Sequence, residues 1–252
     1  VIGCEVYTAA RTRHDKDADR DKYQGHLVLL AKNNDGYKNL IKIVSKGFTE
    51  GYYYKPRVDY EVLEKYHEGI IALSACLAGE IPSRILKEDF DGARAAARKM
   101  RDIFGENNFF LELQDHGIRE QTQVNTSLIR LSKELGIPMV VTNDVHYIRE
   151  EDAIPHDLLL CIQTGKKLAD EDRMRYEGGQ YYVKSEQEMA ELFPYARQAL
   201  ENTQKIAARC HVEIEFGVTK LPHFEVPEGY DSWSYLNKLC FDGLKERYPQ
   251  NH

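Results

Sequence analysis

The sequence predicts an α/β fold in which strands and helices alternate, arranged either as a barrel or as an open sheet. Short apolar runs of strand length recur along the first half of the chain, and segments with helical spacing lie between them. Three clean strand–helix cycles follow one another in the part of the chain before residue 141. Such repetition favours parallel strands joined by helices.

The first quarter of the chain contains two predicted strands and one predicted helix. Residues 1–9 form a strand-like apolar run, and residues 26–31 form a second. Between them, residues 11–22 are charged and lack an apolar period, which predicts a mobile loop. Residues 36–48 are predicted to be a helix because apolar side chains recur at helical spacing, at Tyr37, Leu40, Ile41 and Val44.

The middle of the chain continues the alternation. A tyrosine-rich turn is predicted at residues 52–57. Gly105 and Gly136 follow two of the helical patterns, as glycine commonly does at helix C-termini. The other elements are, in order, a short helix at 60–67, a strand at 69–74, a helix at 89–104, a strand at 108–113, a helix at 120–135 and a strand at 137–141.

After residue 146 the pattern changes to a mostly helical extension. Residues 165–180 are polar and irregular, and residues 217–229 contain two prolines and no helical period, which predicts a linker. Helices are expected at 152–162, 186–192, 195–210 and 233–248, the last with an apolar face that requires a partner. We therefore divide the chain into a main α/β region at 1–165, a largely helical remainder at 166–220, and a linker with the start of a further region at 221–252.

The composition is that of a globular protein. Of the 252 residues 42% are hydrophobic and 30% charged, and no apolar stretch approaches the roughly 20 residues that cross a membrane. A formal net charge of −7 argues against a broadly basic nucleic-acid groove but not against a local one. Five scattered cysteines without a CxxC pair indicate separate thiols in a reducing compartment. The chain starts at Val1 without methionine, so we expect it to be a fragment.

The most informative motif is Asp144-Val145-His146, which follows the apolar run at residues 137–141. Alternate residues of an extended chain point to the same side, so a carboxylate and an imidazole are presented together. In α/β folds the catalytic groups gather at the carboxyl ends of strands. The motif therefore predicts one wall of a metal site. The alternative is that His146 ends the strand and Asp144 starts a turn.

Four further candidate residues lie at the ends of other predicted strands: Glu5, His26, Cys76 and His116. Taken singly, each has an ordinary explanation, namely a half-buried strand-end charge, a hydrogen-bonded histidine, a small core residue and a turn residue. Taken together at one rim, they favour a site for more than one divalent ion, for which zinc, manganese or iron is better suited than calcium. Such ions activate water and neutralise charge on a phosphoryl group.

Basic side chains beside aromatic ones are the candidate substrate contacts. Arg57 and Lys55 follow the three tyrosines at 52–54, and Arg11 and Arg13 lie in the charged loop. Aromatic rings next to cations suit single-stranded nucleic acid, because bases stack while cations contact phosphates. The alternative is a tyrosine-rich turn that covers the core. The chain has no nucleophile elbow, P-loop or GxGxxG motif.

Several ordered motifs of the chain resemble one family. The motifs are IGCEVY at residues 2–7, HLVLLAKN at 26–33 with GYKNL at 36–40, TNDVHY at 142–147, QTGK at 163–166, YYVKS at 181–185 and LP at 221–222. They resemble the polymerase-and-histidinol-phosphatase (PHP) domain, in the form found at the front of bacterial replicative DNA polymerase α subunits. The resemblance extends over essentially the whole chain.

The resemblance implies a distorted (β/α)7 barrel of the PHP type, incomplete at its N-terminus and followed by a mostly helical extension. It implies up to three divalent ions, zinc before manganese or iron, held by residues that include Glu5, His26, Cys76, Asp144 and His146. Glu5 and Asp144 would have the catalytic role, while His116 and Arg57 would lie near the substrate. Four of the family's nine ligand positions precede the segment that starts at Val1. We therefore expect this chain alone to bind metal weakly and to be inactive.

The function implied is that of a DNA-directed DNA polymerase, a nucleotidyltransferase of DNA replication, whose PHP region is a metal-dependent 3′→5′ proofreading exonuclease. Its partners would be a DNA primer–template and other replicase subunits such as the sliding clamp and clamp loader, in the cytoplasm and without a membrane. One alternative is a non-catalytic domain that braces the polymerase or docks a subunit. Another is a free-standing phosphatase of the histidinol-phosphate type.

Overall fold

A seven-stranded sheet forms the centre of the computed structural model, which describes residues 1–250. The strands follow the order β3-β4-β1-β2-β5-β6-β7. Their bounds are β1 Ile2–Ala9, β2 Gln24–Ala31, β3 Tyr52–Tyr53, β4 Lys55–Val58, β5 Ile70–Leu73, β6 Phe109–Leu113 and β7 Met139–Val141. All five predicted strands are present. The prediction of a simple turn at 52–57 was wrong, because β3 and β4 form a hairpin there.

The sheet is mixed and, within the described residues, open. β2 runs antiparallel to both β1 and β5, whereas β5, β6 and β7 are parallel to one another. β4 is parallel to β1, so only β2 and β3 run against the other strands. β3 and β7 stand at opposite ends of the strand order and do not pair. The sequence predicts parallel strands, and among the five predicted strands this prediction is correct for β5, β6 and β7. It is wrong for β1 and β2, which are joined by a loop without a helix and therefore pair antiparallel.

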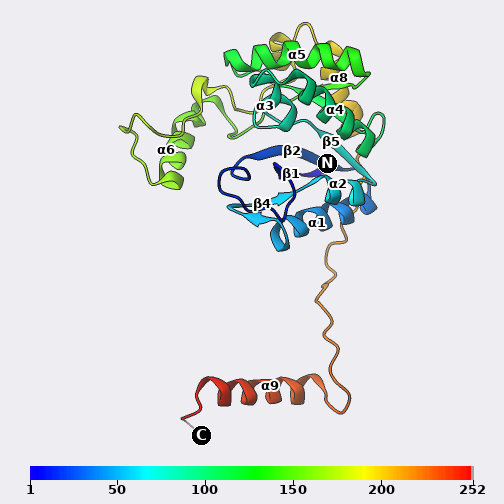
Figure 1. Ribbon diagram of the computed structural model, residues 1–252, viewed down its shortest axis with the longest axis vertical. Helices are drawn as coiled ribbons and strands as arrows, with labels where there is room; N and C mark the ends of the chain where they lie inside the picture. Colours follow the sequence, from blue (N-terminus) through cyan, green and yellow to red (C-terminus); the bar gives the residue numbers. More distant parts are fainter. Residues whose placement is uncertain (251–252) are drawn as a thin grey trace. The chain divides into compact units, whose positions relative to one another are not determined.

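Helices cover both faces of the sheet (Figure 1). Their bounds are α1 Asn34–Thr49, α2 Tyr60–Tyr66, α3 Glu80–Leu86, α4 Phe90–Phe104, α5 Arg119–Leu135, α6 Ala153–Thr164, α7 Glu186–Leu192 and α8 Arg197–Ala207, with single 3-10 turns at Glu150–Asp152 and Glu177–Gly179. α1 packs on β1, β2 and β4, α5 on β6, and α8 on β7. The glycines expected at helix ends follow α4 and α5 with positive φ, 85° at Gly105 and 67° at Gly136.

Helix α3 is absent from the sequence prediction. Pro82 interrupts the helical pattern there and suggests a break. In the structure Pro82 is the third residue of α3, within the first turn. The first N–H groups of a helix have no partner inside the helix, so a proline is tolerated at this position.

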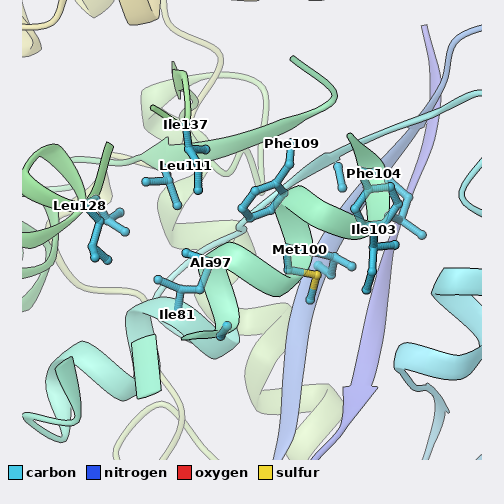
Figure 2. Packing of buried hydrophobic residues seen from close by; sticks show 14 of the residues in the cluster. Ile81, Ala97, Met100, Ile103, Phe104, Phe109, Leu111, Leu128 and Ile137 are labelled. Atoms are coloured by element: carbon cyan, nitrogen blue, oxygen red, sulfur yellow. The ribbon is translucent and has the colours of Figure 1, made fainter. Parts of the chain in front are cut away.

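The main hydrophobic core lies between one face of the sheet and helices α1 to α5, together with Phe193, Ala196 and Ala199 of the α7–α8 segment. Figure 2 shows its centre, where Phe109 and Leu111 of β6 face Ala97 and Met100 of α4. A smaller cluster occupies the opposite face and comprises Ile71, Leu73, Phe110, Val140 and Ile206. β5 and β6 are buried along their whole length. Burial on both faces explains their continuous apolar sequences.

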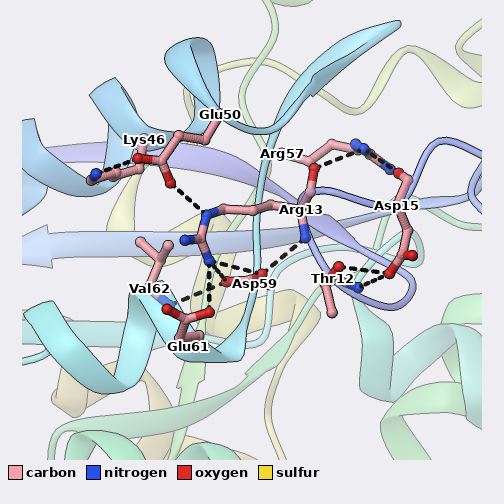
Figure 3. A network of polar contacts seen from close by, with 9 residues as sticks. All are labelled: Thr12, Arg13, Asp15, Lys46, Glu50, Arg57, Asp59, Glu61 and Val62. Atoms are coloured by element: carbon pink, nitrogen blue, oxygen red, sulfur yellow. Dashed lines mark hydrogen bonds and ion pairs between the residues drawn. The ribbon is translucent and has the colours of Figure 1, made fainter.

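The loop at 11–22 has no helix or strand, as predicted, but the expectation that it is mobile is contradicted by its contacts. Arg13 is only 8% exposed, and its guanidinium binds Asp59 and Glu61 while its Nε donates to Glu50 (Figure 3). Farther along the loop, the fully buried Asp21 accepts hydrogen bonds from its neighbour Arg11. The loop is therefore held by buried charge pairs, which an apolar period cannot reveal.

The chain divides into two compact units, residues 1–213 and the residues from 214 onward. In the second unit, residues 214–230 form no regular structure apart from turns, and helix α9, Ser232–Arg247, follows as predicted. All five cysteines are free thiols. Among residues 1–250, no helix combines the length and the apolar character needed to cross a membrane.

Candidate metal centre at the strand ends

Most of the candidate site residues lie at one edge of the sheet, but Glu5 is the fourth of the eight residues of β1, so its predicted position at a strand end was wrong. β1, β5, β6 and β7 all run in one direction, so their carboxyl ends share that edge with the amino end of the antiparallel β2. His26 lies near the start of β2, while Cys76, His116 and Asp144 follow β5, β6 and β7. Leu27 and Leu29 belong to the main core, so His26 points to the opposite face of the sheet.

His26 is in contact with two of the predicted ligands. Its Nδ1 lies 3.1 Å from Oε1 of Glu5 and 3.4 Å from Sγ of Cys76. Glu5 is the diagonal neighbour of His26, because Tyr7 pairs with His26 and Glu5 pairs with Val28. The side chain of Glu5 is 41% exposed, in keeping with the half-buried state predicted from its neighbours. The backbone N–H of His26 donates to Ala78 at 3.1 Å, which brings the Cys76 loop, residues 74–79, against β2.

Asp144 and His146 lie in a second loop, residues 142–147, which we call the Asp144 loop. Asp144 has a φ of 40°, in the left-handed region that non-glycine residues seldom adopt. His146 Nδ1 lies 2.7 Å from the carbonyl oxygen of Asp144. A carbonyl only accepts, so Nδ1 carries the proton and Nε2 keeps its lone pair. The hydroxyl of Tyr176 lies 3.0 Å from that Nε2 and donates to it.

The two parts of the site interact through charge. Burial, together with the nearby carboxylates of Asp144 and Glu5, raises the pKa of the Cys76 thiol to about 12. Burial also raises the pKa of Tyr176, with Asp144, Cys76 and Glu5 contributing in that order. Contacts within the part of the chain that the structure describes do not bring three His, Cys, Asp or Glu side chains into one group arranged to hold an ion. The site is thus a pair of contacts to His26 together with a nearby Asp144 loop.

His116 is buried rather than open to a substrate. It is 2% exposed and stacks on Tyr181 with a ring-centroid distance of 3.8 Å. Its Nε2 donates to the carbonyl of Asn143 at 2.8 Å, and Gln121 donates to its Nδ1 at 2.7 Å. Burial lowers the pKa of His116. This placement makes His116 a support for the Asp144 loop.

Arg57 does not face a substrate either. It is completely buried, and its guanidinium donates to the carbonyls of Gly51, Arg13 and Asp15 at 3.1, 3.2 and 2.8 Å (Figure 3). The prediction of a direct substrate contact is therefore contradicted by burial. Lys55, two residues earlier on β4, is exposed and lies 5.4 Å from the ring centroid of Tyr7.

Several residues of the site are absent from the sequence prediction. Glu112 of β6 is 5% exposed, and its carboxylate accepts hydrogen bonds from residues of the loops that follow the two adjacent strands, β5 and β7. The sequence contains a sign of this role, because Glu112 is a lone glutamate within the apolar run FFLEL, and a buried carboxylate requires hydrogen-bond partners. Tyr176, Tyr181 and His156 pack around His146, with Tyr176 4.4 Å from it between ring centroids. Tyr176 and Tyr181 lie some thirty residues farther along the chain, so no local pattern connects them with the motif.

The donor set fits a divalent transition-metal ion. Two carboxylates, two imidazoles and one thiol are the ligand types that zinc and related ions take in proteins. The proton of His146 is held by a backbone carbonyl, an arrangement typical of histidines that bind metal through the other nitrogen. Burial is the main reason that the pKa values of Cys76 and Tyr176 are raised, and the smaller contribution from the Asp144 and Glu5 carboxylates is negative charge that a cation would compensate.

Comparisons with known proteins show which family and which proteins the chain is similar to. Residues 1–116 match the PHP domain family. DNA polymerase III subunit alpha of Treponema pallidum is 44% identical over 250 residues, which is 98% of this chain and 21% of that protein. The corresponding proteins of Borreliella burgdorferi and Thermus aquaticus are 45% and 42% identical over 98% and 99% of this chain. The chain spans only about a fifth of the length of these relatives.

Proposed function

Because the chain belongs to the PHP domain family through residues 1–116 and aligns over nearly its whole length with DNA polymerase III α subunits, we propose that it is a part of such a replicative polymerase. The parent protein would be a DNA-directed DNA polymerase that works on a primer–template in the cytoplasm. It would act there with other replicase subunits such as the sliding clamp and clamp loader. In the parent protein, the open sheet would be part of the (β/α)7 barrel implied by the family.

The activity we propose for this region is a metal-dependent 3′→5′ exonuclease that removes mispaired nucleotides. Divalent ions, zinc before manganese or iron, would supply activated water and charge neutralisation at the scissile phosphodiester. The residues that would hold them are Glu5, His26, Cys76, Asp144 and His146. The observation that carries the proposal is the contact of His26 on β2 with Glu5 on β1 and with Cys76 in the loop after β5, near the loop after β7 that carries Asp144.

Other side chains of the chain would orient the substrate. Tyr176 presents its hydroxyl beside His146 and is the aromatic group best placed to lie against a terminal nucleotide. Its loop is held by Arg173, whose guanidinium binds both carboxylate oxygens of Asp157, at 2.5 and 2.7 Å. On the other side of the site, the exposed Lys55 is available for the DNA backbone.

The proposal is tested by trimming of a primer with a mismatched 3′ end, using the longer polymerase that contains this chain. We compare wild type with Asp144→Asn, each with and without a chelator. The expected result is metal-dependent trimming that the variant loses while it still extends matched primers. Asp115→Asn is a matched control, because it removes a carboxylate after the neighbouring β6 that is outside the ligand set. Equal trimming by wild type and Asp144→Asn, or none by either, would overturn the exonuclease and leave this region as a bracing or docking domain.

A further inference from the structure

We propose that Glu112 is a positioning residue that holds the Cys76 loop and the Asp144 loop at a fixed spacing. The significance of that spacing rests on the proposed function, because both loops carry proposed metal ligands. Glu112 itself is not assigned to the ligand set.

The position of Glu112 in the sheet allows it to reach both loops. β6 lies between β5, which leads into the Cys76 loop, and β7, which leads into the Asp144 loop. The Oε2 atom of Glu112 accepts a hydrogen bond from the backbone N–H of Ala75 at 3.0 Å, directly before Cys76. Its Oε1 atom accepts a hydrogen bond from the hydroxyl of Thr142, at the start of the Asp144 loop. One carboxylate therefore joins two loops that share no direct hydrogen bond among those found in the described chain.

Three further hydrogen bonds hold Glu112 and its partners in place. The backbone N–H of Glu112 donates to the hydroxyl of Ser74 at 2.8 Å. The amide of Gln114 donates both to Oε1 of Glu112, at 3.0 Å, and to the hydroxyl of Thr142, at 3.2 Å. Both carboxylate oxygens therefore have donors, which is the condition under which a buried carboxylate is tolerated.

An apolar side chain would be the ordinary choice at this position. Glu112 alternates with the core residues Leu111 and Leu113, so it shares the opposite face with Phe110 and Val140 of the smaller cluster. Placing a carboxylate among them is costly unless it is fully hydrogen-bonded. Its retention points to a task that an apolar residue cannot perform.

The backbones that Glu112 holds are unusual. Ala75 has a φ of 60°, and Asp144, two residues after Thr142, has a φ of 40°. Non-glycine residues occupy this region at a cost and stay there when surrounding contacts hold them. The hydrogen bond to the N–H of Ala75 is such a contact, and it sets the direction in which the chain enters Cys76.

The first test measures the loops directly, without metal. Amide hydrogen exchange is compared in the full chain for wild type, Glu112→Gln and Asn202→Ala. Asn202 is the matched control, because it is a buried polar residue, 9% exposed, that donates to Met139 of β7 at 2.8 Å but contacts neither loop. We expect Glu112→Gln to speed exchange at least about tenfold at residues 74–79 and 142–147, and Asn202→Ala to leave both segments unchanged. Unchanged exchange in Glu112→Gln, or equal effects in both variants, would overturn the proposal.

The second test asks whether the spacing matters for metal. Manganese and zinc are titrated into the same proteins, and affinity is expected to fall about tenfold or more in Glu112→Gln and to stay at the wild-type level in Asn202→Ala. Thr142→Val removes one hydrogen-bond donor to Glu112 and keeps the side-chain shape, so its metal affinity is expected to lie between those of the other two variants. It replaces Glu112→Gln in this test if Glu112→Gln does not fold. Wild-type affinity in a folded Glu112→Gln or Thr142→Val would count against the positioning role. This chain alone is expected to bind the ions weakly, so where its wild-type affinity is too low to measure, the same titration is made in the longer polymerase that contains it. A wild-type polymerase without affinity for either ion would defeat the metal-centre proposal, and hydrogen exchange would then decide the role of Glu112.

Discussion

Removal of the Arg13 guanidinium is expected to destabilise the fold more than any other change in the 11–22 loop. Arg13 and Asp59 are 8% and 5% exposed, and the Arg13 guanidinium contacts both oxygens of the Asp59 carboxylate, at 3.0 and 3.1 Å (Figure 3). The substitution Arg13→Met keeps most of the side-chain volume but leaves Asp59 buried without its cation. Loss of one partner from a buried ion pair costs about 3–5 kcal/mol.

The structure places the expected value at the lower end of that range. Asp59 keeps two backbone donors in the variant, the N–H of residue 13 at 2.9 Å and the N–H of Val62 at 3.1 Å. The hydrogen bond from Val62 is the one by which Asp59 caps the N-terminus of α2, so the start of this helix is retained. We therefore expect a loss of about 3 kcal/mol, which corresponds to a fall of roughly 6–12 °C in Tm for a chain of this size.

The assay is urea unfolding of wild type, Arg13→Met, Asp59→Asn and the double variant. Asparagine also caps helices, so Asp59→Asn removes the charge and keeps the cap. The two single changes should be strongly non-additive, with a coupling of about 1 kcal/mol or more, because the double variant contains no buried unpaired charge. A loss below about 1 kcal/mol in Arg13→Met, or additive single effects, would show that this pair behaves like an exposed ion pair and refute the reasoning.

Three further changes have clear expected outcomes. Gly36→Ala should lower the free energy of unfolding in urea by about 1–3 kcal/mol, because a Cβ there would lie 1.9 Å from the carbonyl oxygen of Gly69. The control is Gly243→Ala, whose Cβ meets open space and which should be neutral or slightly stabilising. Phe109→Ala, at a 1% exposed core position, should cost about 3–5 kcal/mol, and a cost below 2 kcal/mol would indicate that the core collapses around the cavity. The hydroxyl and the N–H of residue 185 lower the pKa of Glu188 to about 2, so its contribution to α7 should be complete above pH 4.5 and lost as the pH falls towards 2. Hydrogen exchange across α7 should show that acid dependence in wild type and not in Glu188→Gln.

Much of the fold is determined locally and could be predicted from the sequence. The five strands that carry apolar runs are all present, and the helices that end at Gly105 and Gly136 end where predicted. Periodicity and glycine at a helix end act through neighbours in the chain, so they are visible without a structure. The same holds for the choice of Asp144 and His146, which follow the end of a buried strand.

The direction of β2 and the pairing of β4 depended on the tertiary structure. The sequence of β2 is compatible with parallel or antiparallel pairing, and the path of the loop at 11–22 decides that it runs antiparallel to β1. β4 forms a strand because it pairs with the edge of β1 that β2 leaves free. A four-residue strand that contains Pro56 has a weak pattern of its own. Its backbone is satisfied only through hydrogen bonds to distant residues.

The sequence by itself determined which chemical groups this chain carries and that Cys76, His116 and Asp144 follow strand ends. Only the tertiary structure decided which of them meet. It brought His26 into contact with Glu5 and Cys76, and it buried Arg57 and His116 as supports. The physical reason is that periodicity reports which face a side chain points to, whereas burial of a charged group depends on donors from other strands. Glu112 is satisfied by Ala75 and Thr142, residues that lie far from it in the chain, and no local pattern records such a partnership.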